Sequence, residues 1–205
     1  MRRFLADHRA ASAAEFAMIL PLALLMLFGV IDAGMYGWQL NEYEKATQMG
    51  VRYAIVTDVV SEGLADEGLT YVGETTCGGG GLVAGQTICA DALGTIVCTS
   101  ADCSCTGNCP ANADTLDATA FGNIVARMQR FQPRIAAADV TVEYRGSGLG
   151  FAGDPNKPEI SPIVTVRVND AVYTPMVLSF FGGSVPLPDF SYSLTLEDGE
   201  GTASS

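Results

Sequence analysis

The strongest pattern in the chain is an uninterrupted apolar run near its N-terminus. Phe16–Ile31, sixteen residues, contains no charged or strongly polar side chain. A helix needs about 20 apolar residues to cross a bilayer core. The apolar character continues past Asp32 to Tyr36 and Trp38, whose rings suit the headgroup boundary. We therefore predict a membrane-spanning helix over residues 14–38, with a carboxylate near each end.

A helical stripe continues beyond this run. Met49, Tyr53, Val56 and Val60 recur at spacings of four, three and four residues, which places them on one face of a helix. We interpret residues 11–60 as one long helix. Its first half would lie in lipid, and its second half would pack an apolar face against a protein core outside the membrane.

The C-terminal part carries one helical pattern and three strand-like patterns. Residues 114–131 predict a helix that Asp114 caps and Pro133 ends. Its apolar face comprises Leu116, Ala120, Phe121, Ile124, Val125, Met128 and Phe131. The runs 140–145, 162–168 and 190–197 predict strands, and the last two alternate apolar and polar residues.

We expect these strands to form an antiparallel sheet that packs on the outer half of the long helix. Residues 114–205 would then be the main part of an α+β fold. The apolar run 174–188, between the last two strands, is expected to fill the core of this domain. A partner-facing or membrane-facing patch would have the same composition.

Residues 61–113 form a loop-like, cysteine-rich region. Its turn sequences contain all six cysteines, Cys77, Cys89, Cys98, Cys103, Cys105 and Cys109. The even number favours disulfides in an oxidising compartment, and the spacing leaves the connectivity open. A zinc site is the alternative, but no CxxC pair and no nearby histidine supports it. We therefore expect no metal.

Charge sets the expected topology. The formal net charge is −12, which argues against a nucleic-acid partner. Arg2, Arg3 and Arg9 precede the apolar run, whereas the chain after it is acidic. Because positive residues mark the cytoplasmic side of a membrane helix, residues 1–10 should be a cytoplasmic leader and residues 61–205 should be exported.

The sequence lacks recognisable catalytic motifs. His8 is the single histidine and lies in the leader, so an exported domain would lack the imidazole of Ser-His-Asp and Cys-His sites. The glycine pattern of residues 146–153 resembles a dinucleotide fingerprint, but prolines follow it where a helix is required. We expect no enzyme and no cofactor. Composition alone leaves open a hydrolase built on two carboxylates.

The N-terminal segment resembles a known family in its amino-acid sequence. AASAAEFAMILPLALLMLFGVIDAGMY, followed by ATQMGVRYAIV, is similar to the TadE/TadG-like minor pseudopilins of the tight-adherence (Flp, type IVb) pilus system. The matching features are EFA, the LPL step, the FGVIDAG exit and the later GVRYA. The resemblance covers residues 9–56. It implies a pilin-like domain, an inner-membrane location, other pilin-like subunits as partners and no catalysis.

The resemblance also assigns roles to residues at the start of the helix. A prepilin peptidase would cut between Ala10 and Ala11, although glycine is usual at the position of Ala10. Glu15, followed by the aromatic Phe16, would then neutralise the new α-amine of a neighbouring subunit during assembly. The alternative for Glu15 is simple exposure to water at the cytoplasmic interface.

Two other functions remain compatible with the sequence. A signal peptidase could cut near Ala33 or Gly34 and release a binding protein with a disulfide-braced acidic domain, or that protein could remain tethered to the membrane. The less favoured alternative is an exported hydrolase. The preferred interpretation is a membrane-anchored minor subunit that takes part in assembly of a tight-adherence pilus or its secretion machinery.

Overall fold

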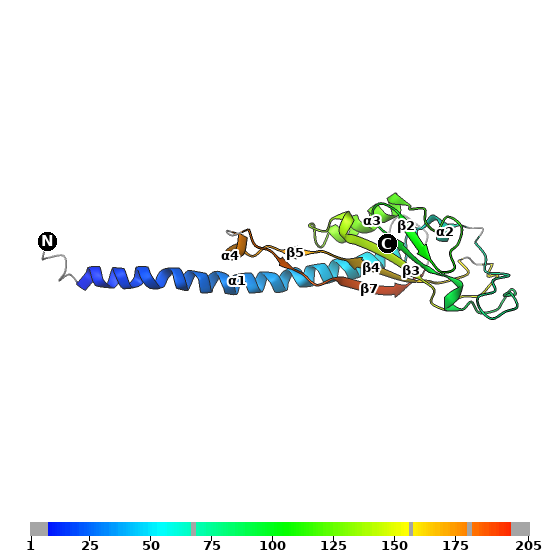
Figure 1. The fold of residues 1–205 in the computed structure, drawn as a ribbon, viewed down its shortest axis with the longest axis horizontal. Helices are drawn as coiled ribbons and strands as arrows, with labels where there is room; N and C mark the ends of the chain where they lie inside the picture. Colours follow the sequence, from blue (N-terminus) through cyan, green and yellow to red (C-terminus); the bar gives the residue numbers. More distant parts are fainter. Residues whose placement is uncertain (1–7, 67–68, 156–157, 180–181, 198–205) are drawn as a thin grey trace. The chain divides into compact units, whose positions relative to one another are not determined.

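The longest element is α1 (His8–Ala54), a helix of 47 residues. The computed structural model describes residues 8–66, 69–155, 158–179 and 182–197, and Figure 1 shows their elements. The other helical elements are α2 (Glu62–Ala65), η2 (Ala90–Ala92), α3 (Ala118–Gln129), η3 (Ala137–Asp139) and α4 (Met176–Ser179). The strands are β1 (Thr95–Cys98), β2 (Cys103–Thr106), β3 (Val140–Arg145), β4 (Ile163–Val168), β5 (Val172–Tyr173), β6 (Val185–Pro186) and β7 (Phe190–Thr195).

The chain divides into two compact units, and α1 contributes to both. The first, which we call the helix unit, consists of residues up to Asn41 together with Val172–Leu187. The second, the sheet unit, consists of Glu42–Ala171 and Pro188–Ser205. The short β5–β6 hairpin therefore accompanies the first part of α1, whereas the large sheet accompanies its last part.

The sheet unit is built on a five-stranded antiparallel sheet with the order β2-β1-β3-β4-β7. The three strands predicted from the sequence are present as β3, β4 and β7, and the α+β class is confirmed. The sequence pattern missed β1 and β2, which lie within the cysteine-rich region. They are only four residues each, and Thr99 closes the turn between them by accepting hydrogen bonds from the amides of Ala101 and Asp102.

One face of this sheet is the core of the sheet unit. Alternate residues of β3 and β4 are buried there: Val140, Val142, Tyr144, Val164, Val166 and Val168. The last turns of α1 and the buried face of α3 pack on this face. Gly50 of α1 marks the contact, since a Cβ at this position would lie 2.7 Å from Cγ of Met128 in α3 and 3.5 Å from Cγ1 of Val166 in β4.

The predicted extent and contact face of the long helix need correction. α1 ends at Ala54, not near Val60. Met49 and Tyr53 are half-buried, whereas Ala46, Gly50 and Ala54 are fully buried. The small residues form the contact because they let the helix backbone approach the sheet and α3, which larger side chains would prevent.

The cap of the second predicted helix also differs. Asp117, not Asp114, caps α3, and its carboxylate accepts hydrogen bonds from the amides of Thr119 and Ala120 at 2.8 and 2.9 Å. Leu116 precedes the helix and forms a β-bridge with Ser61, which holds it in an extended conformation. The predicted apolar face is otherwise present: Ala120, Phe121, Ile124, Val125 and Met128 are buried.

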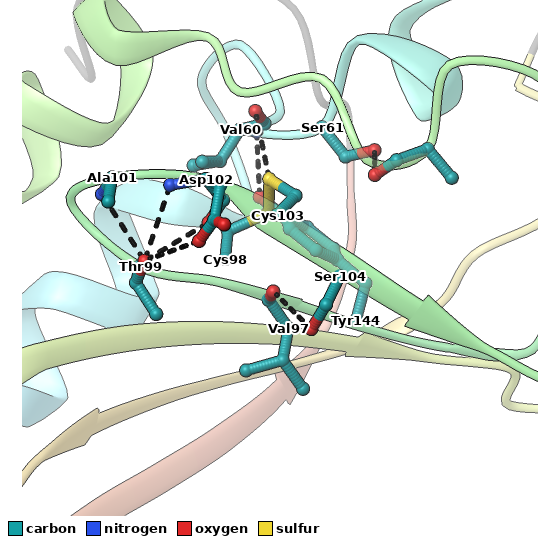
Figure 2. The surroundings of a disulfide bond; sticks show 11 residues. Val60, Ser61, Val97, Cys98, Thr99, Ala101, Asp102, Cys103, Ser104 and Tyr144 are labelled. Atoms are coloured by element: carbon teal, nitrogen blue, oxygen red, sulfur yellow. Dashed lines mark hydrogen bonds between the residues drawn. A yellow bond between two sulfur atoms is a disulfide. The ribbon is translucent and has the colours of Figure 1, made fainter.

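All six cysteines form disulfides, as predicted: Cys77–Cys89, Cys98–Cys103 and Cys105–Cys109. Cys98 and Cys103 face each other across β1 and β2 (Figure 2). Next to them, the buried hydroxyl of Tyr144 accepts a hydrogen bond from the amide of Val60 at 2.9 Å, and burial raises the pKa of Tyr144. This bond fixes the chain shortly after it leaves α1.

The apolar run 174–188 does not fill the core as expected. Met176 and Leu178 are 59% and 42% exposed, although Leu187 is buried. The run belongs to the helix unit, where it forms α4 and β6, rather than to the sheet unit.

We predict that Gly50→Val destabilises the sheet unit by about 1–3 kcal/mol, because it overpacks the junction of α1, α3 and β4. Urea unfolding of the full chain measures the change. Gly122→Val is the matched control, since Gly122 is an exposed glycine of α3 where an added Cβ meets no described atom within 4 Å. Equal effects of the two substitutions would contradict this packing.

Candidate membrane-anchoring and assembly site

The first part of α1 is apolar and exposed on all sides. Every residue from Ala13 to Ile31 is exposed. The most apolar stretch of 18 residues has a mean hydropathy of 2.3, and none of it is buried. The exposed fraction reaches 83% for Met18 and 72% for Val30. By length and composition this helix can cross a membrane, and such an exposed apolar surface in one helix is typical of contact with lipid.

The residues of the predicted processing and assembly site lie at the start of this helix. Ala10 and Ala11 are in the first turn of α1, one turn before Glu15. Glu15 is exposed, and Phe16 beside it is 64% exposed. Within the part of the chain that the structure describes, no group pairs with the Glu15 carboxylate. Its role in assembly and the cut before Ala11 stay predictions.

Asp32 is the one carboxylate in the apolar part of α1 that is buried, with 8% of its surface exposed. Its partners come from α4, about 140 residues later in the chain. Oδ1 accepts a hydrogen bond from the amide of Met176 at 2.8 Å, and Oδ2 accepts one from the amide of Val177 at 3.1 Å. Both oxygens of Asp32 are therefore occupied, and the carboxylate caps the first turn of α4 from outside the helix.

An aromatic pair supports this contact. The hydroxyl of Tyr173 lies 3.3 Å from Oδ1 and 3.2 Å from the backbone oxygen of Asp32, so it can donate to either. The ring of Tyr173 packs edge-on against Tyr36, with 5.7 Å between the ring centres. We call Val172–Leu187, which carries β5, α4 and β6, the 172–187 hairpin. It lies along α1 in Figure 1.

Sequence reasoning placed Asp32 in the helix but found no role for it. One signal was available: Asp32, Tyr36, Gln39 and Tyr43 are spaced by four, three and four residues, and all are buried or half-buried. These residues form a second stripe on α1, of polar and aromatic side chains rather than apolar ones. The partner of Asp32 was not predictable, because nothing in the pattern of residues 172–187 indicates which polar group its amides bind.

Two carboxylates of the sheet unit hold the cysteine-rich region together. Glu74 accepts hydrogen bonds from the amides of Thr75 and Thr76 and from the side chain of Asn108, and these bonds, that of Thr76 foremost, lower the pKa of Glu74. Glu159 is buried and accepts a hydrogen bond from the amide of Tyr71 at 2.8 Å. Both groups serve as hydrogen-bond acceptors within the fold.

Among the described residues, no group of three histidine, cysteine, aspartate or glutamate side chains is arranged to hold a metal ion. The cysteine sulfurs that a zinc site would need are joined in disulfides.

Comparison with known proteins supports the resemblance of the N-terminal segment. Residues 10–52 match the family described as TadE-like protein. The match contains Glu15, Phe16 and Asp32, covers about a fifth of the chain and lies almost entirely within α1. Searches of curated proteins and of solved structures gave no match. The family similarity therefore rests on the helix, and the structure alone describes the domain that follows.

We predict that Asp32→Ala detaches the 172–187 hairpin from α1, since two amides and the Tyr173 hydroxyl lose their acceptor. Each unpaired donor costs about 1–3 kcal/mol. Amide hydrogen exchange at Met176 and Val177 should therefore accelerate at least about tenfold, which corresponds to about 1.4 kcal/mol. The protein should be measured in lipid nanodiscs.

Asp32→Asn should have an intermediate effect, because it keeps one acceptor oxygen. Asp189→Ala removes an exposed carboxylate next to the hairpin and serves as the control. Unchanged exchange at Met176 and Val177 in Asp32→Ala would show that the carboxylate does not hold the hairpin.

Proposed function

We propose that this protein is a pilin-like subunit that α1 anchors in the bacterial inner membrane, with the N-terminus in the cytoplasm and the disulfide-bonded domain in the periplasm. We propose further that it takes part in assembly of a tight-adherence pilus or its secretion machinery. The observation that carries the proposal is the division of α1. One continuous helix has an exposed apolar first part that matches the TadE-like family and a last part that belongs to the core of the sheet unit.

The dimensions of α1 support the anchor. Phe16 and Trp38 are 22 residues apart, which corresponds to about 33 Å along a helix and fits a hydrocarbon core of about 30 Å. Trp38 is 63% exposed, as expected for a ring in the headgroup layer. Asp32 lies inside this interval, but the hairpin covers its carboxylate, so that the charge does not meet lipid directly.

Two independent features support the same orientation. The arginines of the leader precede the membrane segment, as is typical of the cytoplasmic side. The three disulfides lie after it, and disulfides persist in oxidising compartments such as the periplasm.

The proposed role of Glu15 in assembly rests on the lipid that would surround it. Helices in lipid gain no hydrophobic energy by associating, so polar pairs and close packing determine which helices bind each other. A cut between Ala10 and Ala11 would create an α-amine one turn from Glu15. The carboxylate of one subunit could then pair with the amine of a neighbour while the exposed apolar helices pack side by side. Carboxylates inside membranes usually have such a partner.

The contacts of Asp32 favour this proposal over release by signal peptidase. A cut near Ala33 or Gly34 would remove Asp32 from the domain. The amides of Met176 and Val177, together with the Tyr173 hydroxyl, would then lose the acceptor that they bind. The 172–187 hairpin would also lose the helix against which it lies. A chain built for such a release would not be expected to place a buried contact on the discarded segment.

The proposal is tested by Glu15→Ala in cells that contain the remaining pilus subunits and the prepilin peptidase. Because the variant lacks the proposed partner of the α-amine, its co-purification with other pilin-like subunits should fall about tenfold or more, equivalent to about 1.4 kcal/mol. The amount of the variant in the membrane should stay the same, since the apolar helix is intact.

Glu44→Ala is the matched control, because Glu44 is an exposed glutamate of α1 outside the predicted span. Its co-purification should equal that of the natural protein. Equal recovery of partner subunits with Glu15→Ala and with Glu44→Ala would contradict the assembly role of Glu15.

A further inference from the structure

We propose that the 172–187 hairpin is a second membrane contact: its tip lies in the outer leaflet of the bilayer that α1 spans, with Met176 and Leu178 against lipid. This inference rests on the proposed anchoring of α1. The apolar run does not contribute to the core of the sheet unit. A lipid surface would be the partner of its exposed side chains.

The position of Asp32 along α1 determines the expected depth of the hairpin in the bilayer. Asp32 follows Glu15 by 17 residues, which is about 26 Å along a helix. If Glu15 lies at the cytoplasmic edge of a hydrocarbon core of about 30 Å, Asp32 lies just inside the outer edge. The amides of Met176 and Val177 bind Asp32 at 2.8 and 3.1 Å, so α4 is at the same depth.

The composition of the hairpin suits that depth. No residue from Ala171 to Pro188 carries a formal charge, although Asp170 and Asp189 stand directly before and after this stretch. This stretch of 18 residues is the longest in the sequence without a charged side chain, although 16–31 and 75–90 reach 16 residues each. Such a segment matches a partner that offers hydrocarbon and no specific charge.

The large exposed side chains described in the hairpin are apolar, and its exposed polar residues are the small Thr174, Ser179 and Ser184. Val172, Met176 and Leu178 are 52%, 59% and 42% exposed. They belong to the same compact unit as the exposed apolar part of α1. Lipid that surrounds α1 at the level of Asp32 would therefore also meet these side chains.

Several described backbone groups near the tip of the hairpin have partners within the protein. Besides the two amides that bind Asp32, the amide of Ser179 donates to the oxygen of Pro175 at 2.8 Å, and the amide of Gly183 donates to the oxygen of Leu178 at 2.9 Å. The hydroxyl of Ser179 donates to the oxygen of Met176 at 2.7 Å. Backbone groups in lipid must form hydrogen bonds within the protein, because no water is present there. The hydrogen bonds of these groups meet that requirement.

The test uses the intrinsic fluorescence of a single tryptophan in the full-length protein. Trp38→Phe removes the native tryptophan, and Leu178→Trp introduces one at the tip of the hairpin. The protein is reconstituted in phosphatidylcholine vesicles with or without lipids that carry bromine on their acyl chains, which quench a tryptophan in contact with them. Acrylamide in the aqueous phase measures exposure to water. Met176→Trp is a second reporter at the same tip.

Two reporters elsewhere in the chain calibrate the signal. Leu25→Trp lies in the exposed apolar part of α1, and Val83→Trp lies on an exposed loop of the sheet unit. We expect brominated lipid to quench Leu178→Trp and Met176→Trp to the same order as Leu25→Trp, and not to quench Val83→Trp. We expect acrylamide to show the reverse order.

The remaining outcomes overturn the inference in distinguishable ways. If Leu25→Trp is quenched by lipid but both tip reporters are quenched only by acrylamide, the hairpin faces water while the anchor stands. If the tip reporters are shielded from both quenchers and the shielding disappears on dilution in lipid, another subunit covers the tip. If Leu25→Trp is not quenched by lipid, the anchor itself fails, and the inference fails with it.

Discussion

The structure depends on the fact that one helix has to suit two surroundings. The first part of α1 offers apolar side chains in every direction, whereas its last turns offer small residues to a sheet and to α3. Asp32 stands between these two parts. A carboxylate inside a membrane is costly, by roughly 2.5–3.5 kcal/mol at a helix centre and by less near the edge, where the proposed position of α1 places Asp32. The amides of α4 and the hydroxyl of Tyr173 offset this cost by taking the place of water around both oxygens of Asp32.

The sheet unit shows how the exported part is stabilised around the end of α1. Its valine-rich core lies between β3, β4, α3 and the last turns of α1. The cysteine-rich region buries large side chains, including Ile88, Leu93 and Ile96, and three disulfides with short loops also hold it. The amide of Val60 donates to Tyr144, so the chain is fixed to the sheet as it passes from the helix to this region. Helix, sheet and disulfide loops therefore meet at the end of α1.

Patterns that repeat over many residues were predictable from the sequence. The apolar run of α1 is continuous over many residues, and the alternation in β4 and β7 has a period of two, so these elements agree with the prediction. β1 and β2 were missed, because four residues are too few to show alternation. The sequence favours Asp114 as the cap of α3, because it does not show the β-bridge between Leu116 and Ser61. This tertiary contact keeps Leu116 outside the helix. Likewise, a face of large apolar residues was expected on α1, although the sheet contact requires small ones.

The sequence proposes a candidate site only from residues that are close together in the chain, and the roles of these residues stay predictions. Ala10, Ala11, Glu15 and Phe16 form a local motif, and the family match covers them. Asp32 lies in the same match, but its partners Met176 and Val177 come from the far end of the chain. A local pattern contains no information about such a pairing. The sequence therefore predicts that the apolar run containing Met176 and Val177 fills a core, because most apolar runs in folded domains do so.

The central claim is that α1 remains part of the protein as a whole and carries the membrane anchor, Asp32 and one side of the sheet core together. The mass of the mature protein purified from membranes tests it most directly. We predict a chain that begins at Ala11 and contains three disulfides. A mature chain that begins at Gly34 or Met35 would contradict it, because the anchor and Asp32 would both have been removed.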